Sequence, residues 1–177
     1  NIHFVSYESF DLEFEISYPS QWEKVEGNNF ILFESNPENS TDNLREFIEV
    51  TFEPLREDGT LQERISRNET IRLMENRLNE RTSGAISDAA SSLTVSNLSN
   101  TTYAGYPARM VEYNFTLPPV GQIRAKDIII LDNNELYTIR YFAEGSKFDK
   151  YLPTIQTMIR SFNISEVQGY ENFDLGL

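Results

Sequence analysis

The chain has 177 residues, of which 39% are hydrophobic and 12% aromatic, and this size and composition fit one domain with a substantial core. Its formal net charge is −13, which argues against binding to nucleic-acid phosphates or to anionic membrane surfaces. Cysteine is absent, so disulfides, thiolate metal sites and Cys nucleophiles are excluded.

The first predicted element is a β-strand over residues 10–18. Apolar and polar side chains alternate there, so one face is expected to be buried and the other wet. Pro19 ends this strand because proline cannot donate to a strand ladder. Trp22 follows in a short segment. Gly27-Asn28-Asn29 is typical of a hairpin turn, and residues 30–35 form the return strand.

A polar loop over residues 36–43 precedes a second alternating strand over residues 47–55. A helix is predicted next. The Thr-Leu-Gln-Glu sequence that starts at Thr60 is a capping box, in which two side chains satisfy free backbone N–H groups. The apolar face of this helix rotates near residues 66–68, so we expect a kink or a restart there. Gly84 suits the C-terminal end of the helix.

The second half of the chain returns to strands, which are predicted over residues 93–98, 108–117, 122–131 and 136–143. A turn is expected at residues 103–107, and a tight hairpin at residues 132–135, where Asn tolerates positive φ. Apolar residues recur at helical spacing over residues 148–162. Pro153 belongs in a first helical turn, so the main helix is expected to start near Tyr151.

The order of strands, helix, strands and helix predicts an α+β fold. We expect an antiparallel, twisted β-sheet of about six to eight strands, with two main helices packed on its apolar face. A single domain is expected over residues 1–165. Residues 166–177 carry Gly, Asn and acidic residues, and are expected to form a flexible C-terminal tail.

Six Asn-x-Ser/Thr sequons are present, at Asn39, Asn68, Asn97, Asn100, Asn114 and Asn163. Random placement of the 16 Asn and 28 Ser or Thr residues would give about 2.5. N-glycans are attached on the outer side of a membrane, so this excess favours an exported, glycosylated protein. A chance spacing on an Asn-, Ser- and Thr-rich surface is the alternative. Loop-like sequence makes Asn39, Asn97 and Asn100 the best acceptors, and a strand pattern makes Asn114 a weaker one.

The start of the chain also bears on its location. The chain begins at Asn1 with no charged-then-apolar leader, so we expect a mature product that has lost a leader or an anchor. No apolar run reaches the roughly 18 residues of a transmembrane helix. The sequence therefore predicts an extracellular or cell-surface location.

Residues that could support chemistry are few. His3 is the only histidine and lies at the chain start, where it does not suit a catalytic triad. Oxygen ligands suit Ca²⁺ and Mn²⁺, and the weak metal candidates are Asp11, Glu13, Glu15, Asp132 and Glu135. The wet face of a strand and a hairpin turn already account for these acidic residues without a metal ion. No phosphate-binding glycine loop is present, and Tyr137 and Tyr141 are expected to be core residues.

Four segments resemble a known family in their order along the chain. Phe14–Trp22 has a strand followed by Pro-x-x-Trp, and Gly105–Ala108 has a Gly-x-Pro-Ala turn before a long strand. Glu135–Tyr141 is a Tyr-containing late strand, and Tyr151–Phe162 is a closing helix that ends in Ser-Phe. Together they resemble the PsbP-like domains of the Mog1/PsbP fold, and this resemblance implies an α/β/α arrangement.

The resemblance implies varied functions. Some members assist photosystem II, where they help to retain manganese, calcium and chloride; others bind a small GTPase or are exported bacterial and archaeal proteins. The matching residues Pro19, Trp22, Gly105 and Phe162 pack or turn the chain, so function does not follow from them. The −13 charge and the lack of a basic patch disfavour docking to an acidic photosystem surface. The sequons favour an exported archaeal member.

We therefore expect a non-catalytic, exported PsbP-like accessory or binding domain without a cofactor. It is expected to act through protein–protein contacts at the cell envelope. A protein that binds Ca²⁺, Mn²⁺, Zn²⁺ or a small ligand is the first alternative, and an uncharacterised hydrolase is the second.

Overall fold

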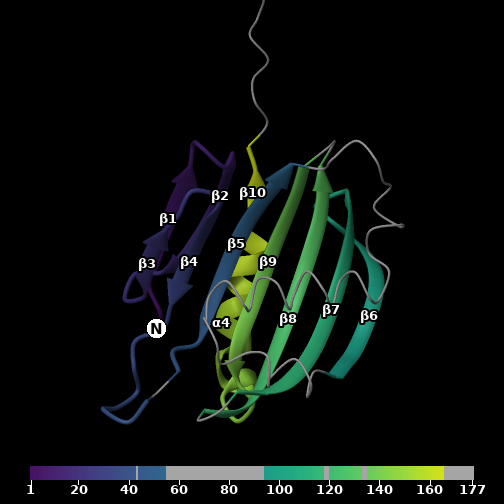
Figure 1. The fold of residues 1–177 in the computed structure, drawn as a ribbon. Coiled ribbons are helices and arrows are strands. Elements are labelled where there is room, and N and C mark those ends of the chain that lie inside the picture. Colours follow the sequence, from purple (N-terminus) through teal and green to yellow (C-terminus); the bar gives the residue numbers. More distant parts are fainter. Residues whose placement is uncertain (43, 55–93, 118–119, 133–134, 166–177) are drawn as a thin grey trace, which may run out of the picture.

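The computed structural model describes residues 1–42, 44–54, 94–117, 120–132 and 135–165. Their elements, in chain order, are β1 (Phe4–Ser9), β2 (Phe14–Pro19), β3 (Glu23–Glu26), β4 (Phe30–Glu34), β5 (Phe47–Pro54), β6 (Thr94–Tyr103), β7 (Tyr106–Leu117), β8 (Gly121–Asp132), β9 (Glu135–Glu144), α4 (Phe148–Ser161) and β10 (Asn163–Ile164). A seven-stranded sheet has the order β3-β4-β5-β9-β8-β7-β6, and a three-stranded sheet has the order β1-β2-β10 (Figure 1). Every strand pair is antiparallel.

Helix α4 packs on one face of the large sheet. Figure 1 shows it behind β5 and β9, with the small sheet beside it. Ile155 and Met158 are fully buried there, against Ile139 and Tyr141 of β9 and Phe14 of β2. The amphipathic spacing of the closing segment therefore sets its buried face.

The opposite face of the large sheet has a second buried cluster of its own. It consists of Val111, Tyr113, Phe115, Ile123, Ala125 and Phe142. Ile128, Ile129 and Ile130 are all buried, so this part of β8 is covered on both faces, as its unbroken apolar run indicates. The expectation of a sheet with one apolar face and one wet face is wrong for the central strands.

The hairpin between β6 and β7 depends on a turn with positive φ angles. Tyr103 pairs with Tyr106, and the two residues between them, Ala104 and Gly105, have φ angles of 48° and 87°. Two-residue turns of this kind match the twist of the strands but favour glycine. The predicted turn at residues 103–107 is confirmed, with β7 starting at Tyr106.

Substitution of Gly105 by alanine should lower the free energy of unfolding by about 1–2 kcal/mol, the cost of a left-handed conformation for an L-residue. A Cβ at this position would meet nothing within 4 Å, so the loss reports backbone strain alone. Gly145→Ala is the control, because its φ is ordinary and its Cβ would meet Gln122 O at 3.4 Å. Urea denaturation measures both. Equal losses for the two variants would contradict the prediction.

Other strand and helix boundaries differ from the sequence-based expectations. Strand β1 was not anticipated, and residues 10–13 form a turn before β2 rather than the start of a strand. Phe10 is 81% exposed because it lies in that turn. Helix α4 starts at Phe148, not near Tyr151, so Pro153 lies inside the helix and not in its first turn.

The described residues hold the single helix α4, so two main helices on the sheet are not supported. The helix predicted from Thr60 to Gly84, the sequon at Asn68 and the predicted tail over residues 166–177 all lie outside the described residues. Helix α4, the single helix in the described part of the chain, does not have the length and hydropathy that crossing a bilayer requires.

Candidate functional site

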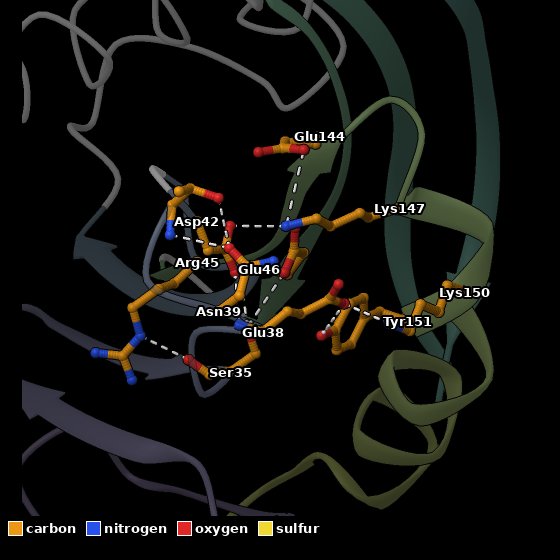
Figure 2. Close-up of polar contacts among 11 residues, drawn as sticks. Ser35, Glu38, Asn39, Asp42, Arg45, Glu46, Glu144, Lys147, Lys150 and Tyr151 are labelled. Carbon is orange, nitrogen blue, oxygen red and sulfur yellow. Dashed lines mark hydrogen bonds and ion pairs between the residues drawn. The ribbon is translucent and has the colours of Figure 1, made fainter. Parts of the chain in front are cut away.

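The most extensive polar cluster joins the loop between β4 and β5 to the start of α4 (Figure 2). The loop is shaped locally: Asn39 Oδ1 accepts hydrogen bonds from Thr41 N at 2.9 Å and from Thr41 Oγ1 at 2.6 Å. Asp42 Oδ2 accepts a third from Glu38 N at 2.8 Å. Asn and Asp favour such turns because their side chains bond to nearby backbone groups. The turn leaves the other Asp42 oxygen directed at the helix.

Lys147, the residue before α4, is the centre of this cluster. Its Nζ lies 2.7 Å from Asp42 Oδ1, 3.5 Å from Glu46 Oε1 and 3.7 Å from Glu144 Oε2 (Figure 2). The Asp42 and Glu46 side chains are 1% and 0% exposed, and that of Lys147 is 17% exposed. One ammonium group therefore faces three carboxylates in a largely dry setting, where such contacts are strong.

Glu46 also forms hydrogen bonds with Ser35, which follows β4. Its backbone carbonyl accepts from Ser35 N at 2.8 Å, and its Oε2 accepts from Ser35 Oγ at 3.2 Å. Its Oε1 has no hydrogen-bond partner among the described residues, although Lys147 lies within ion-pair distance. Glu46 therefore depends on Lys147 for compensation of its buried charge.

A second contact lies one turn further along α4. Glu38 pairs with Lys150 and accepts a hydrogen bond from the Tyr151 hydroxyl at 2.8 Å. The Tyr151 ring meets Trp22 edge-on, with centroids 6.2 Å apart. The loop thus contacts two successive turns of the helix.

The carboxylates of the cluster have pKa values shifted in opposite directions. The hydrogen bond from Lys147, and then that from Glu38 N, lower the pKa of Asp42. Burial raises the pKa of Glu46, and the charge of Lys147 opposes this only in part. Burial disfavours the charge of Lys147, but the hydrogen bond to Asp42 and the charges of Glu46 and Glu144 outweigh it, so its pKa is raised. A lysine held charged in this way is a structural cation, not a base.

A buried ion pair lies on the face of the sheet opposite α4. Arg140 Nε and Nη2 donate to the two carboxylate oxygens of Asp127 at 2.9 and 2.8 Å. The Tyr113 hydroxyl donates to Asp127 Oδ1 at 3.3 Å. Asp127 and Arg140 are directly opposite on β8 and β9, with side chains 1% and 4% exposed. The two-point geometry is the strong form of an Arg–carboxylate contact.

The predicted acidic metal candidates are only partly brought together. Asp11 and Glu13 lie in the turn before β2, and Glu15 lies on β2, so the three do not form a row on one strand face. Asp132 is directly opposite Glu135, and burial, followed by the charges of Glu13 and Asp132, raises the pKa of Glu135. Among the described residues no three His, Asp or Glu side chains are arranged to hold a metal ion.

The five described sequons occupy different settings. Asn39, Asn97, Asn100 and Asn163 are exposed, whereas Asn114 of β7 is half-buried. Asn163 Nδ2 donates to Glu15 Oε1 at 3.2 Å. Asn97 and Asn100 lie on β6, so their placement in a loop is wrong.

The remaining sequence-based expectations concern aromatic and terminal residues. Tyr137 and Tyr141 are fully buried core residues, as predicted, and their hydroxyls donate to backbone carbonyls of Leu12 and Phe148. His3 is exposed at the start of the chain. The Lys147 cluster and the Asp127–Arg140 pair were not anticipated.

Taken together, these features define an α+β domain in which a seven-stranded antiparallel sheet carries a helix on one face. A loop is fastened to the start of that helix by ion pairs, and the sheet itself encloses a buried ion pair.

The chain belongs to the PsbP family, whose family model matches residues 2–164. No curated protein sequence matches the chain. The structure is similar to that of cyanobacterial PsbP (CyanoP) from Synechocystis, with a TM-score of 0.68 at 15% identity, covering 93% of this chain and 94% of that one. The PsbP-like resemblance of the sequence is therefore confirmed.

Two further structures share the fold at lower similarity. One is LpqN, a protein involved in cell envelope biogenesis of Mycobacterium tuberculosis, with a TM-score of 0.56 at 11% identity, covering 93% of this chain and 92% of that one. The other is PA94 from Pseudomonas aeruginosa, with a TM-score of 0.54 at 10% identity, covering 90% and 95%. At such identities the similarity concerns the fold, and function needs a separate argument.

Proposed function

We propose that this chain is a non-catalytic, exported accessory domain that acts through protein–protein contacts at the cell surface. The observation that carries the proposal is that its buried charges hold elements of the fold together. Asp127 is held at both oxygens by Arg140, and Lys147 is held by Asp42 and two glutamates. Groups fixed in this way are not poised to accept or release a proton during a reaction.

Two further observations support the location. One relative of the same fold is a protein involved in cell envelope biogenesis. Four of the five described sequon asparagines are exposed, as glycan attachment would require. A surface that supplies shape and polar contacts, while the buried ionic groups hold the fold together, suits an accessory role.

The proposal is tested by chemical cross-linking in native cells that express a tagged copy of the chain, followed by separation of envelope and cytosol. We expect a defined partner in the envelope fraction. An Ile155→Asp variant is the control: Ile155 is fully buried, so the variant should unfold and lose any partner that recognises the folded surface. Recovery of the chain from the cytosol alone, or the same partners with both copies, would reject the proposal.

A metal-binding role is the second candidate, because Asp132 is directly opposite Glu135 and the charges of Glu13 and Asp132 help to raise the pKa of Glu135. A divalent cation would relieve that repulsion. Calorimetric titration with Ca²⁺, Mn²⁺ and Zn²⁺ separates the two roles. Micromolar binding that is lost in Glu135→Gln would favour the metal site, whereas binding only at millimolar concentration would reject it.

A further inference from the structure

The two edges of the large sheet are different in kind. The β3 edge has four residues, Glu-Lys-Val-Glu, of which three are charged. The β6 edge has ten residues, Thr94–Tyr103, of which none is charged, in a chain whose net charge is −13. Sheet edges are usually protected by shortness or by charge, because unpaired backbone groups attract further strands. The β3 edge has both protections, and the β6 edge has neither.

Among the described strands, β6 has a pairing partner on one side only. It ends the strand order of the large sheet, and no other described strand pairs with its outer side. Its described side chains are almost all exposed, including Ser96, Asn97, Asn100 and Thr101. A register irregularity lies between Val95 and Asn97, which locally bends an edge. Beyond it, pairing with β7 is regular from Asn97 to Tyr103, so this part of β6 is a regular strand without a second partner in the described part of the chain.

Two adjacent sequons lie on strand β6. Asn97-Leu98-Ser99 and Asn100-Thr101-Thr102 follow one another directly, and both asparagines are exposed. Side chains alternate between the faces of a strand, so residues three apart lie on opposite faces.

The register confirms this arrangement of the two asparagines. Ser99, which shares the face of Asn97, pairs with Met110, a residue packed against the core beneath α4. Asn100 pairs with Arg109, which shares its face of β7 with Val111, a residue of the second core. Asn97 therefore lies on the α4 side of the sheet edge and Asn100 on the opposite side.

We propose that Asn97 and Asn100 carry N-linked glycans that shield the β6 edge, one on each face of the sheet. In the attachment step, the side-chain Nδ2 forms a bond to the anomeric carbon of a saccharide carried by a lipid phosphate. The anomeric carbon–oxygen bond of that donor breaks, the lipid phosphate leaves with the bonding electrons, and Nδ2 loses one proton. Two bulky, hydrated groups on opposite faces prevent an incoming strand from lying in the plane of the sheet.

The other described sequons are not placed to shield the β6 edge. Asn163 donates to Glu15, and Asn114 is half-buried on β7. Asn39 is exposed in the loop between β4 and β5, away from the β6 edge, so Asn39→Gln is a matched control that removes a sequon without changing the edge.

This inference rests on the proposed export of the chain, because N-glycans are added outside the cytoplasm. The first measurement is glycopeptide mass spectrometry on the chain purified from fractionated native cells. We expect glycans at both Asn97 and Asn100 in the exported fraction. An exported chain that is unmodified at both positions overturns the inference and leaves the proposed function standing. A chain found only in the cytosol overturns both.

The second measurement tests the role of the glycans. Wild type, Asn39→Gln and Asn97→Gln/Asn100→Gln are secreted from a host that N-glycosylates, and their self-association is followed by sedimentation velocity. We expect the first two to remain monomeric at concentrations where the double variant forms dimers and larger species. Asn97→Lys/Asn100→Lys should remain monomeric without glycans, because edge lysines replace the shield. A monomeric double Gln variant at all concentrations would overturn the shielding role.

Discussion

Replacement of Asp127 by alanine is expected to lower the free energy of unfolding by about 3–5 kcal/mol, the usual cost of removing one partner of a buried ion pair. Arg140 would keep its charge in a site where its side chain is 4% exposed, with its Nε and Nη2 left without their carboxylate. Domains of this size are stable by about 5–15 kcal/mol, so the variant should be close to unfolded at moderate temperature. Urea denaturation monitored by circular dichroism measures the loss.

Two further variants separate a buried ion pair from a general effect of charge. Asp149→Ala removes an exposed ion pair with Arg124, in which the side chains are 79% and 39% exposed, and should cost less than about 1 kcal/mol. The triple variant Asp127→Leu/Arg140→Met/Glu49→Gln should lose much less than Asp127→Ala, because Glu49 is also buried opposite Arg140, and the three replacements leave no charge at these positions. A loss for Asp127→Ala no larger than that of Asp149→Ala would contradict the prediction.

The Asp127–Arg140 pair could have been predicted from the sequence. Counting outward from the predicted hairpin at residues 132–135 places Asp127 opposite Arg140, and the structure has this register. Each is a charged residue on the same face of its strand as Ala125 or Phe142 of the second core. Two opposite charges paired across a predicted hairpin are the sequence signal of such a pair.

The alternation of apolar and polar residues predicted the positions of the strands better than it predicted which of their faces are buried. The strands of the β7–β8–β9 meander were located correctly because each alternates and ends at a turn of Gly, Pro or Asn. Glu49 lies on the more polar side of the alternation over residues 47–55 and is nevertheless 4% exposed, because alternation defines two faces of a strand but not what covers each one. Phe10 was assigned to the strand that starts only at Phe14, because the alternation continues through a turn in which Glu13 has a φ of 54°.

The Lys147 cluster could not be predicted in the same way. It joins Lys147 to Asp42, 105 residues earlier in the chain, and no periodicity relates the two. Their meeting depends on how the loop after β4 folds back and on where α4 begins. A contact of this kind follows from the complete fold rather than from any segment of the sequence.

Replacement of Lys147 by methionine is expected to cost about 1.5–3 kcal/mol at pH 7, the range for hydrogen bonds to charged groups. The methionine keeps most of the aliphatic stem and removes the ammonium group that faces Asp42, Glu46 and Glu144. Asp42 and Glu46 would remain charged with side chains 1% and 0% exposed. The variant should therefore be destabilised through its two buried carboxylates.

The pH dependence identifies those carboxylates. The pKa of Asp42 is lowered in the folded state, so wild type gains stability from it above pH 3.8 and loses this as the pH falls through the lower folded value. The pKa of Glu46 is raised above 4.5, so wild type loses stability as the pH rises from 4.5 through the folded value. Without Lys147 both folded pKa values rise, and the variant should lose stability more steeply between pH 4.5 and 7.

The difference between wild type and Lys147→Met should therefore be largest at pH 7 and shrink towards pH 4, as urea denaturation at several pH values would measure. Adding Glu46→Gln to the variant should recover part of the loss at pH 7 and little at pH 4, because protonation removes the same charge. Lys150→Met is the matched control, since the Lys150 side chain is 61% exposed and its contribution should stay below about 1 kcal/mol. A loss for Lys147→Met that does not change with pH would contradict the prediction, because only uncompensated carboxylates make the cost depend on protonation.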